Sequence, residues 1–151
     1  MDAKKALNIV AGQCSKKEYC SFDVLKKLQR WELDEKDIVA VMEFLVENHF
    51  LDDVRFAEAY VRDKHRFNRW GKLKIAQMLR QKHVAENIIE HALSSLPEEE
   101  NDTMCLSLLK QKSKGLKEED SYKRKAKLFR FALSRGFDYE KVNRCISQLR
   151  D

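Results

Sequence analysis

The sequence is poor in residues that interrupt helices, with one proline and four glycines among 151 residues. An all-β domain needs turn residues every ~8–12 positions, and phosphate-binding loops need clustered glycines, so neither fits this chain. The longest uninterrupted apolar run covers residues 38–42, far short of the ~20 residues of a membrane span. Residues 1–5 show no long apolar stretch, so we expect no secretory signal. These absences favour a helical protein of the reducing cytoplasm that does not enter a membrane.

Motifs of catalysis and metal binding are missing as well. Gly-x-Ser-x-Gly, the P-loop, Gly-x-Gly-x-x-Gly and His-Glu-x-x-His do not occur. The cysteines at 14, 20, 105 and 145 form no Cys-x-x-Cys pair, and no two histidines have ligand spacing. We therefore predict no enzyme activity, no metal, no cofactor and no disulfide framework.

Apolar periodicity predicts nine helices. They are expected near residues 3–13, 16–30, 35–48, 53–67, 72–83, 86–96, 102–114, 119–135 and 139–150. Ser15 and Glu18 have the spacing of a capping box that would start the second helix, and Asp34, Asp52 and Asp138 occupy expected N-cap positions. Gly115 and Gly136 follow periodic stretches, as C-terminal glycines do. Pro97 and the acidic stretch 98–102 form the best linker candidate.

The nine helices form three groups of three, related by offsets of 51 and then 53 residues. Five apolar positions coincide in all three groups: Leu28, Leu79 and Ala132; Leu33, Val84 and Phe137; Ile38, Ile89 and Val142; Met42, Leu93 and Ile146; Leu45, Leu96 and Leu149. Repetition at a fixed period indicates a repeat architecture. We predict an all-α fold of three tandem three-helix repeats, residues 1–50, 51–97 and 98–151, in an elongated, curved molecule.

Positive charge is concentrated in the second and third repeats. The chain has 30 basic and 25 acidic residues, and the net charges of the three repeats are −1, +3 and +3. One ridge of cations comprises Arg55, Arg62, Arg66 and Arg69, provided that the fourth helix extends that far, and a second comprises Lys123, Lys127 and Arg130. Few acids lie near these ridges in the sequence. An anionic partner, either a nucleic acid or an acidic protein groove, is favoured over a merely solvated surface.

Trp70 and Phe67 lie close to the first ridge and have two interpretations. They could stack on nucleic-acid bases, or they could anchor a turn against the core, which is the more common role of such residues and the one we favour. The histidines at 49, 65, 83 and 91 show no partner arrangement, and we interpret them as surface or turn residues.

Residues 50–64, Phe-Leu-Asp-Asp-Val-Arg-Phe-Ala-Glu-Ala-Tyr-Val-Arg-Asp-Lys, resemble the most recognisable stretch of the RecX family, bacterial regulators of the RecA recombinase. The likeness continues through residues 70–75 (Trp-Gly-Lys-Leu-Lys-Ile), 79–84 (Leu-Arg-Gln-Lys-His-Val) and 133–137 (Leu-Ser-Arg-Gly-Phe). His83 stands where the family usually has glycine, and Gly12, Gln13 and Cys14 stand where arginines are more frequent.

The resemblance implies a non-enzymatic monomer that binds RecA and lodges in the groove of the RecA filament on single-stranded DNA. It would thereby restrain ATP hydrolysis, strand exchange and co-protease activity. The residues expected to contact RecA or DNA are Arg55, Arg62, Arg66, Arg69, Lys72, Lys74, Lys82, Lys123, Lys127, Arg130 and Arg135. Two other functions remain open from the residues alone: a stand-alone DNA-binding protein and a helical scaffold for a partner other than RecA.

Overall fold

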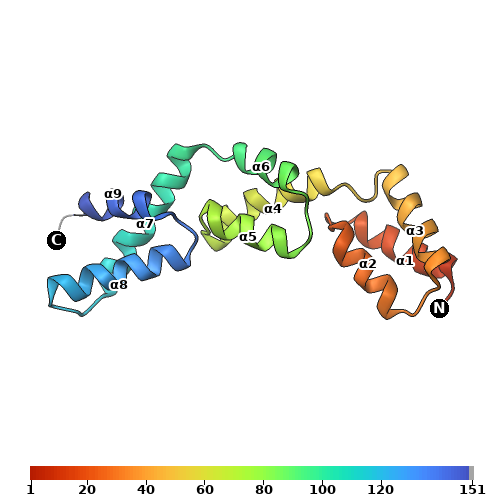
Figure 1. Cartoon of the computed structure of the whole chain (residues 1–151), viewed down its shortest axis with the longest axis horizontal. Helices are drawn as coiled ribbons and strands as arrows, with labels where there is room; N and C mark the ends of the chain where they lie inside the picture. Colours follow the sequence, from red (N-terminus) through yellow and green to blue (C-terminus); the bar gives the residue numbers. More distant parts are fainter. Residues whose placement is uncertain (150–151) are drawn as a thin grey trace. The chain divides into compact units, whose positions relative to one another are not determined.

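The computed structural model describes residues 1–149, which form nine α-helices and no strand. In Figure 1 they are α1 (Ala3–Cys14), α2 (Ser21–Arg30), α3 (Glu35–Glu47), α4 (Asp53–Asn68), α5 (Lys72–Gln81), α6 (Glu86–Ser94), α7 (Glu98–Gly115), α8 (Ser121–Ser134) and α9 (Tyr139–Ser147). The all-helical prediction is confirmed. The predicted end of the last helix, position 150, lies outside the described residues.

Three local predictions about helix ends are wrong. Gly115 does not follow its helix but is the last residue of α7, and no left-handed conformation is found there. Ser15 does not start α2; it ends α1, and its hydroxyl donates a hydrogen bond to the Ala11 carbonyl at 2.9 Å. The acidic stretch 98–102 is not a linker, because it forms the first turns of α7. Its three glutamates lie at the positive end of the helix dipole, where carboxylates stabilise a helix.

The sequence repeat recurs in the helix bounds. Helices α2, α5 and α8 end at Arg30, Gln81 and Ser134, whereas α3, α6 and α9 begin at Glu35, Glu86 and Tyr139. Both series show the predicted offsets of 51 and 53 residues. The intervening turns contain Glu32, His83 and Gly136 at equivalent positions, all in left-handed backbone conformation with φ of 58°, 57° and 99°. In each of the three turns, the helix is therefore followed by a residue in left-handed conformation, which ends the helix and redirects the chain.

Close contacts divide the chain into two compact units. The first unit contains Met1–Ala59 and Leu79–Glu90, and the second contains Tyr60–Met78 and the chain from His91 onward. Because this division passes through α4, α5 and α6, the middle repeat contributes to both units. The repeat boundaries themselves stay a prediction from the offsets.

The first unit is built around apolar residues of α1, α2 and α3, among them Ala6, Leu28 and Leu45, which are fully buried. Here the turn after α5 packs on the start of α2, a contact that we call the first joint. His83 stacks on Phe22 with ring centroids 4.0 Å apart, and Lys82 Nζ lies 2.8 Å from the Asp23 carboxylate. Desolvation opposes the charged form of Asp23, but the hydrogen bonds from Lys82 and Cys20 and the positive charges of Lys82 and Lys17 together outweigh it, so the pKa of that carboxyl is lowered.

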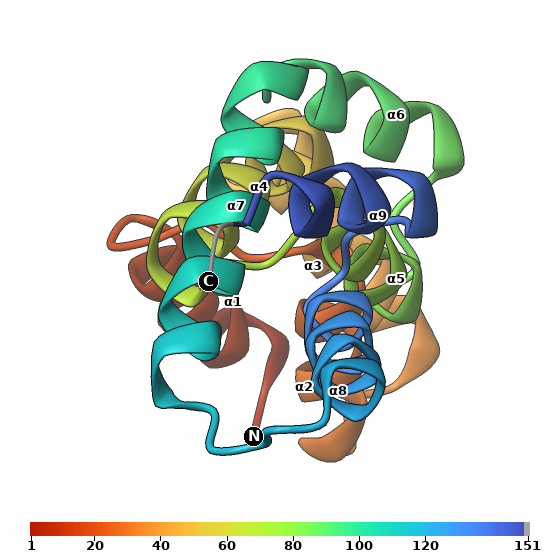
Figure 2. The ribbon, with the colours of Figure 1, turned by 90° about the vertical axis from the view of Figure 1, so that its left-hand side faces the viewer.

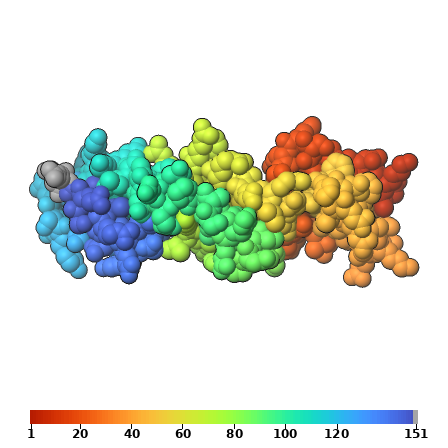
Figure 3. Space-filling view, turned by 90° about the horizontal axis from the view of Figure 1, so that it is seen from above, coloured from red at the N-terminus to blue at the C-terminus, as the bar shows by residue number. Residues whose placement is uncertain are grey.

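The second unit has its core between α7, α8 and α9, with Leu109, Phe137 and Val142 fully buried. The segment 116–120 joins α7 to α8 at the lower edge of Figure 2. The side chains of α9 pack against those of α7, as the dark blue and teal surfaces in Figure 3 show.

In the second unit, the turn after α8 packs on the start of α5, a contact that we call the second joint. The Gly71 amide donates to the Arg135 carbonyl at 2.7 Å, and the Leu73 amide donates to the Gly136 carbonyl at 3.0 Å. A Cβ on Gly71 would overlap the Gly136 carbonyl and come within 2.7 Å of the Phe137 ring. Two glycines therefore let the backbones of the second and third repeats meet directly.

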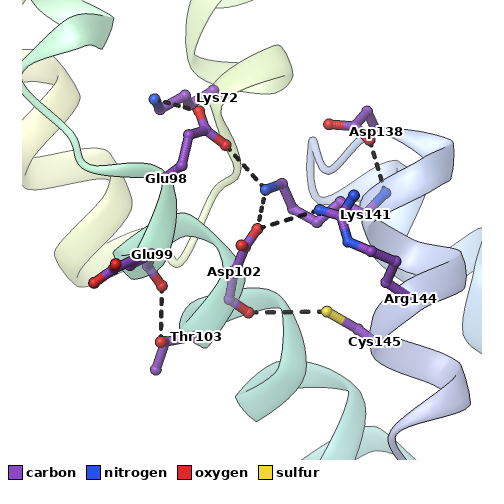
Figure 4. Close-up of polar contacts among 9 residues, drawn as sticks. All are labelled: Lys72, Glu98, Glu99, Asp102, Thr103, Asp138, Lys141, Arg144 and Cys145. Carbon is purple, nitrogen blue, oxygen red and sulfur yellow. Dashed lines mark hydrogen bonds and ion pairs between the residues drawn. The ribbon is translucent and has the colours of Figure 1, made fainter.

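A cluster of ion pairs ties α9 to the start of α7 (Figure 4). Lys141, only 3% exposed at its side chain, contacts Asp102 and lies 3.0 Å from Glu98. Glu98 also pairs with Lys72 at 2.6 Å. Burial opposes the charged form of Lys141, but the hydrogen bonds to Asp102 and Glu98 outweigh it and raise the pKa of the ammonium group. The hydrogen bond from Lys72, followed by that from Lys141, lowers the pKa of Glu98.

Candidate functional site

The first basic ridge is interrupted at its end. Helix α4 stops at Asn68, and Arg69 adopts a left-handed backbone with φ of 59°. Arg62 and Arg66 remain exposed on the helix, the former 3.7 Å from Asp63 and the latter with its guanidinium over the exposed Phe67 ring. Arg69 leaves that face and donates to Gln111 of α7 at 3.0 Å. The ridge therefore ends at Arg66, and Arg69 turns toward the third repeat.

Trp70 is half-buried next to this ridge. Its ring centroid lies 5.3 Å from the ammonium of Lys64 and 4.6 Å from that of Lys74. Its carbonyl accepts a hydrogen bond from Nδ1 of His65 at 3.0 Å, because a carbonyl oxygen can only accept. His65 is 8% exposed, so it is a buried residue rather than a surface or turn histidine. These contacts favour the anchoring role of Trp70 over a freely accessible stacking platform.

Apart from Arg62, which lies beside its sequence neighbour Asp63, four of the predicted contact residues are engaged in ion pairs within the fold. Their carboxylate partners are Glu18 for Arg55 at 3.0 Å, Glu98 for Lys72 at 2.6 Å, Asp23 for Lys82 at 2.8 Å and Glu118 for Lys127 at 3.1 Å. Arg55 also donates to the His49 carbonyl at 2.8 Å, and the hydrogen bond to Glu18 raises the pKa of its guanidinium. Such residues hold segments of the chain together, and less of their charge is available to a partner.

The second ridge lies on α8. It was expected to lack nearby acids, but Lys127 pairs with Glu118. Lys123 and Arg130 are exposed and have no side-chain partner within the part of the chain that the structure describes. Neighbouring Arg124 turns inward and donates to the carbonyls of Ser113 and Leu116 at 2.6 and 2.9 Å. The ridge therefore offers two unpaired cations, while Arg124 secures the segment between α7 and α8.

Arg135, at the end of α8, is half-buried with its guanidinium 4.9 Å from the centroid of the Phe131 ring. Lys112 of α7 lies 5.1 Å from the same ring. Sequence reasoning missed Lys112, Gln111 and Phe131, because only the packing of α7 on α8 brings them to Arg69 and Arg135. Helical spacing gives no signal for a pair such as Arg69 and Gln111, which are 42 residues apart.

No metal or reactive-thiol site emerges from this arrangement. Within residues 1–149 no three His, Cys, Asp or Glu side chains are grouped so that they could hold a metal ion. Cys20, Cys105 and Cys145 are buried free thiols, and desolvation raises their pKa, to about 11 for Cys20. None of the helices within that range has the length and apolar character needed to cross a bilayer.

The fold and the basic surfaces define a class of protein: an all-helical molecule whose turns recur at the offsets of the sequence repeat, with exposed cations that form no ion pair among the described residues. Two family models match the chain and define its family. The model described as "RecX, second three-helix domain" matches residues 52–93, and "RecX, third three-helix domain" matches residues 98–146.

Relatives of known name agree with these models. "Regulatory protein RecX" of Chlorobium phaeobacteroides is 32% identical over 148 residues, covering 98% of this chain and 95% of the relative. "Regulatory protein RecX" of Vibrio parahaemolyticus is 34% identical over 133 residues, covering 88% and 84%. The crystal structure of RecX from Lactobacillus salivarius superposes with a TM-score of 0.86 at 22% identity, over 97% of this chain and 96% of that one. The chain belongs to the RecX family of regulatory proteins.

Proposed function

We propose that this chain binds RecA and the RecA filament on single-stranded DNA, and that it inhibits the recombinase, ATPase and co-protease activities of RecA. The observation that carries the proposal is membership of the RecX family over nearly the whole chain. Its relatives are named regulatory proteins, and no catalytic motif contradicts a binding role. In this proposal the chain acts as a monomer in the bacterial cytoplasm, where RecA works.

The charge distribution supports a partner that is anionic or presents an acidic groove. Arg62, Arg66, Lys123 and Arg130 are exposed and lie on helices of the second unit. We expect these residues, together with Arg69 and Arg135, to contribute to binding. The ion-paired Arg55, Lys72, Lys82 and Lys127 would contribute mainly through the fold, because a salt bridge must be broken before they can bind a partner.

The proposal is tested by following ATP hydrolysis of RecA on single-stranded DNA while the protein is added. We expect inhibition at substoichiometric amounts. The triple variant Arg62→Glu, Arg66→Glu and Arg69→Glu should lose inhibition, because three exposed cations become anions. The matched control, Lys4→Glu, Lys5→Glu and Lys36→Glu, makes the same change in net charge at exposed positions of the first unit and should inhibit normally.

Circular dichroism should show unchanged helicity in both triple variants. Absence of inhibition by the wild-type protein at any ratio, with RecA filaments unchanged, would refute the proposal. Equal inhibition by the two triple variants would leave RecA as the partner but reduce the Arg62–Arg66 ridge to a solvated surface.

A second candidate function is direct DNA binding by the basic surfaces without RecA. The exposed cations of the second unit favour it. Binding to duplex DNA through Z phosphates should weaken with salt at a slope near −0.9Z, whereas an effect that acts through RecA requires RecA. A salt titration of DNA binding by this protein in the absence of RecA therefore distinguishes the two functions.

A further inference from the structure

A pocket of about 400 Å³ lies within the second unit, where the turn after α4 meets α7 and the end of α8. Its polar lining comprises Arg69, Gln111, Lys112 and Arg135, and its aromatic lining is Phe131. No acidic residue of the described chain lines it. The pocket therefore gathers three cations from three separate segments without a compensating carboxylate.

Neutral groups hold the three cations in place. Arg69 Nη1 donates to Gln111 Oε1 at 3.0 Å, while Lys112 and Arg135 lie 5.1 and 4.9 Å from the centroid of the Phe131 ring. Within residues 1–149 none of the three forms an ion pair, in contrast to Lys72 and Lys127 of the same unit. A cation held by an amide or an aromatic face keeps its full charge for a ligand.

The geometry favours a phosphate over a carboxylate. A planar carboxylate is satisfied by one guanidinium fork, whereas the oxygens of a tetrahedral phosphate accept hydrogen bonds from several directions. Arg69, Lys112 and Arg135 approach the pocket from different segments of the chain. Phe131 is only partly exposed and has two cations near its ring, so the ring serves to position them rather than to stack on a base.

A nearby aromatic residue points to a single strand. Phe67, two residues before Arg69, is 71% exposed and lies beneath the guanidinium of Arg66 at 5.5 Å. An exposed ring that is close in the chain to a basic site can stack on an unpaired base, which a duplex does not offer. We propose that the pocket binds a backbone phosphate of single-stranded nucleic acid and that Phe67 stacks on a neighbouring base. The inference rests on the proposed function in that RecA would carry this strand, but the pocket itself requires no RecA.

The experiment measures fluorescence anisotropy of labelled oligothymidylate with the full chain and no RecA, over a salt titration. Arg69→Gln, Lys112→Gln and Arg135→Gln together should weaken binding by about tenfold. The same triple variant should flatten the salt slope by ~0.7 for each phosphate that it no longer neutralises. The control Lys4→Gln, Lys5→Gln and Lys36→Gln removes the same charge from the first unit and should keep the wild-type slope.

Two single variants sharpen the assignment without removing a cation. Gln111→Glu keeps the side-chain shape and places a carboxylate beside Arg69, so it should weaken binding both to oligothymidylate and to an abasic strand of equal length. Phe67→Ala should weaken binding to oligothymidylate only, because an abasic strand has no base to stack. Circular dichroism verifies that each variant is folded.

Several outcomes would overturn the inference: no strand binding by the wild-type protein, identical binding by the pocket and control triples, or equal pocket dependence with duplex DNA. A polyglutamate peptide that needs the pocket while DNA does not would assign it to an acidic protein instead. Strand binding that depends on the pocket, combined with no effect on RecA, would refute the proposed function and leave this inference standing.

Discussion

At the scale of single residues, the second joint depends on two glycines, Gly71 and Gly136. The carbonyl of Gly136 occupies the space in which a Cβ of residue 71 would lie, and a Cβ on Gly136 would overlap Lys74. Gly136 also has φ of 99°, a conformation that side chains rarely adopt. The backbone hydrogen bonds of the joint require this close approach, so both glycines serve packing, and Gly136 in addition supplies the left-handed residue that follows α8.

We predict that Gly71→Ala lowers the free energy of unfolding by about 1–3 kcal/mol, the usual cost of overpacking a close contact. Gly12→Ala is the matched control, because nothing lies within 4 Å of a Cβ at that helical position. It should raise stability by about 0.5–1 kcal/mol, since alanine replaces glycine within a helix. Urea unfolding monitored by circular dichroism measures both, and equal effects of the two substitutions would contradict the glycine contact.

At the scale of helices, the cluster of ion pairs adds to the apolar packing of α9 on α7. Glu98 is the residue that reaches both Lys72 of α5 and Lys141 of α9. Because 66% of its side chain is exposed, solvent screens these pairs, and we expect a contribution of only about 0.5–1 kcal/mol. The pKa of Glu98 is lowered in the folded chain, so this contribution depends on pH.

We predict that Glu98→Gln destabilises the protein at neutral pH and that the difference from wild type disappears in acid. A carboxyl whose folded pKa is depressed contributes fully above its unfolded value, here 4.5, and loses the contribution as pH falls through the lowered pKa. Urea unfolding at a series of pH values measures this. Glu99→Gln, an exposed neighbour in the same helical turn, should change stability little at any pH. A Glu98→Gln effect that persists unchanged in acid would contradict the mechanism.

Periodicity and the offset repeat predicted the helices well, because each three-helix repeat must bury the same stripe. Leu28, Leu79 and Ala132, aligned by the offsets, are all fully buried. Local signals failed where a competing contact was available. Ser15 bonds backward to α1 instead of capping α2, and Glu18, the other half of the expected capping box, pairs with Arg55 of α4. Contacts between residues so far apart in the sequence cannot be predicted from local sequence patterns.

The candidate site was predicted only in part, for the same reason. Residues of one helix face, such as Arg62 and Arg66, follow from spacing alone. The pocket does not, since Arg69, Lys112 and Arg135 meet only through the packing of distant segments. The net charge of each repeat correctly located the excess of basic residues in the second and third repeats. It did not show which cations are free to bind a partner, because that depends on ion pairs within the fold. Lys72, for example, lies in a basic segment but pairs with Glu98.

At the scale of the whole molecule, equivalent turns make both joints but use different chemistry. The first joint, within the first unit, relies on side chains: the His83–Phe22 stack and the Lys82–Asp23 pair. The second joint, within the second unit, relies on backbone hydrogen bonds between glycine-containing segments. Salt screens an exposed ion pair far more than a backbone hydrogen bond. The two joints should therefore respond differently to ionic strength.

We predict that Asp23→Lys and Lys82→Glu each destabilise the first joint and that the double variant, which reverses the pair, recovers part of the loss. Lys82 has a further interaction in the fold, so single substitutions remove more than this pair. A double-mutant cycle with Asp23→Asn and Lys82→Gln, neither of which creates a like-charged pair, isolates the coupling energy. We expect a coupling of about 0.5–1 kcal/mol, diminished at high salt.

Hydrogen exchange then locates the effect. In high salt or in either single variant, amides at the start of α2 and in the turn after α5 should exchange faster, while those of Gly71 and Leu73 in the second joint stay protected. The exposed pair Arg80–Glu86 joins two ends of one turn at 2.6 Å, and reversing it provides the control, because it should leave the start of α2 unaffected. Equal acceleration at both joints would contradict the prediction that the Lys82–Asp23 pair stabilises the first joint alone.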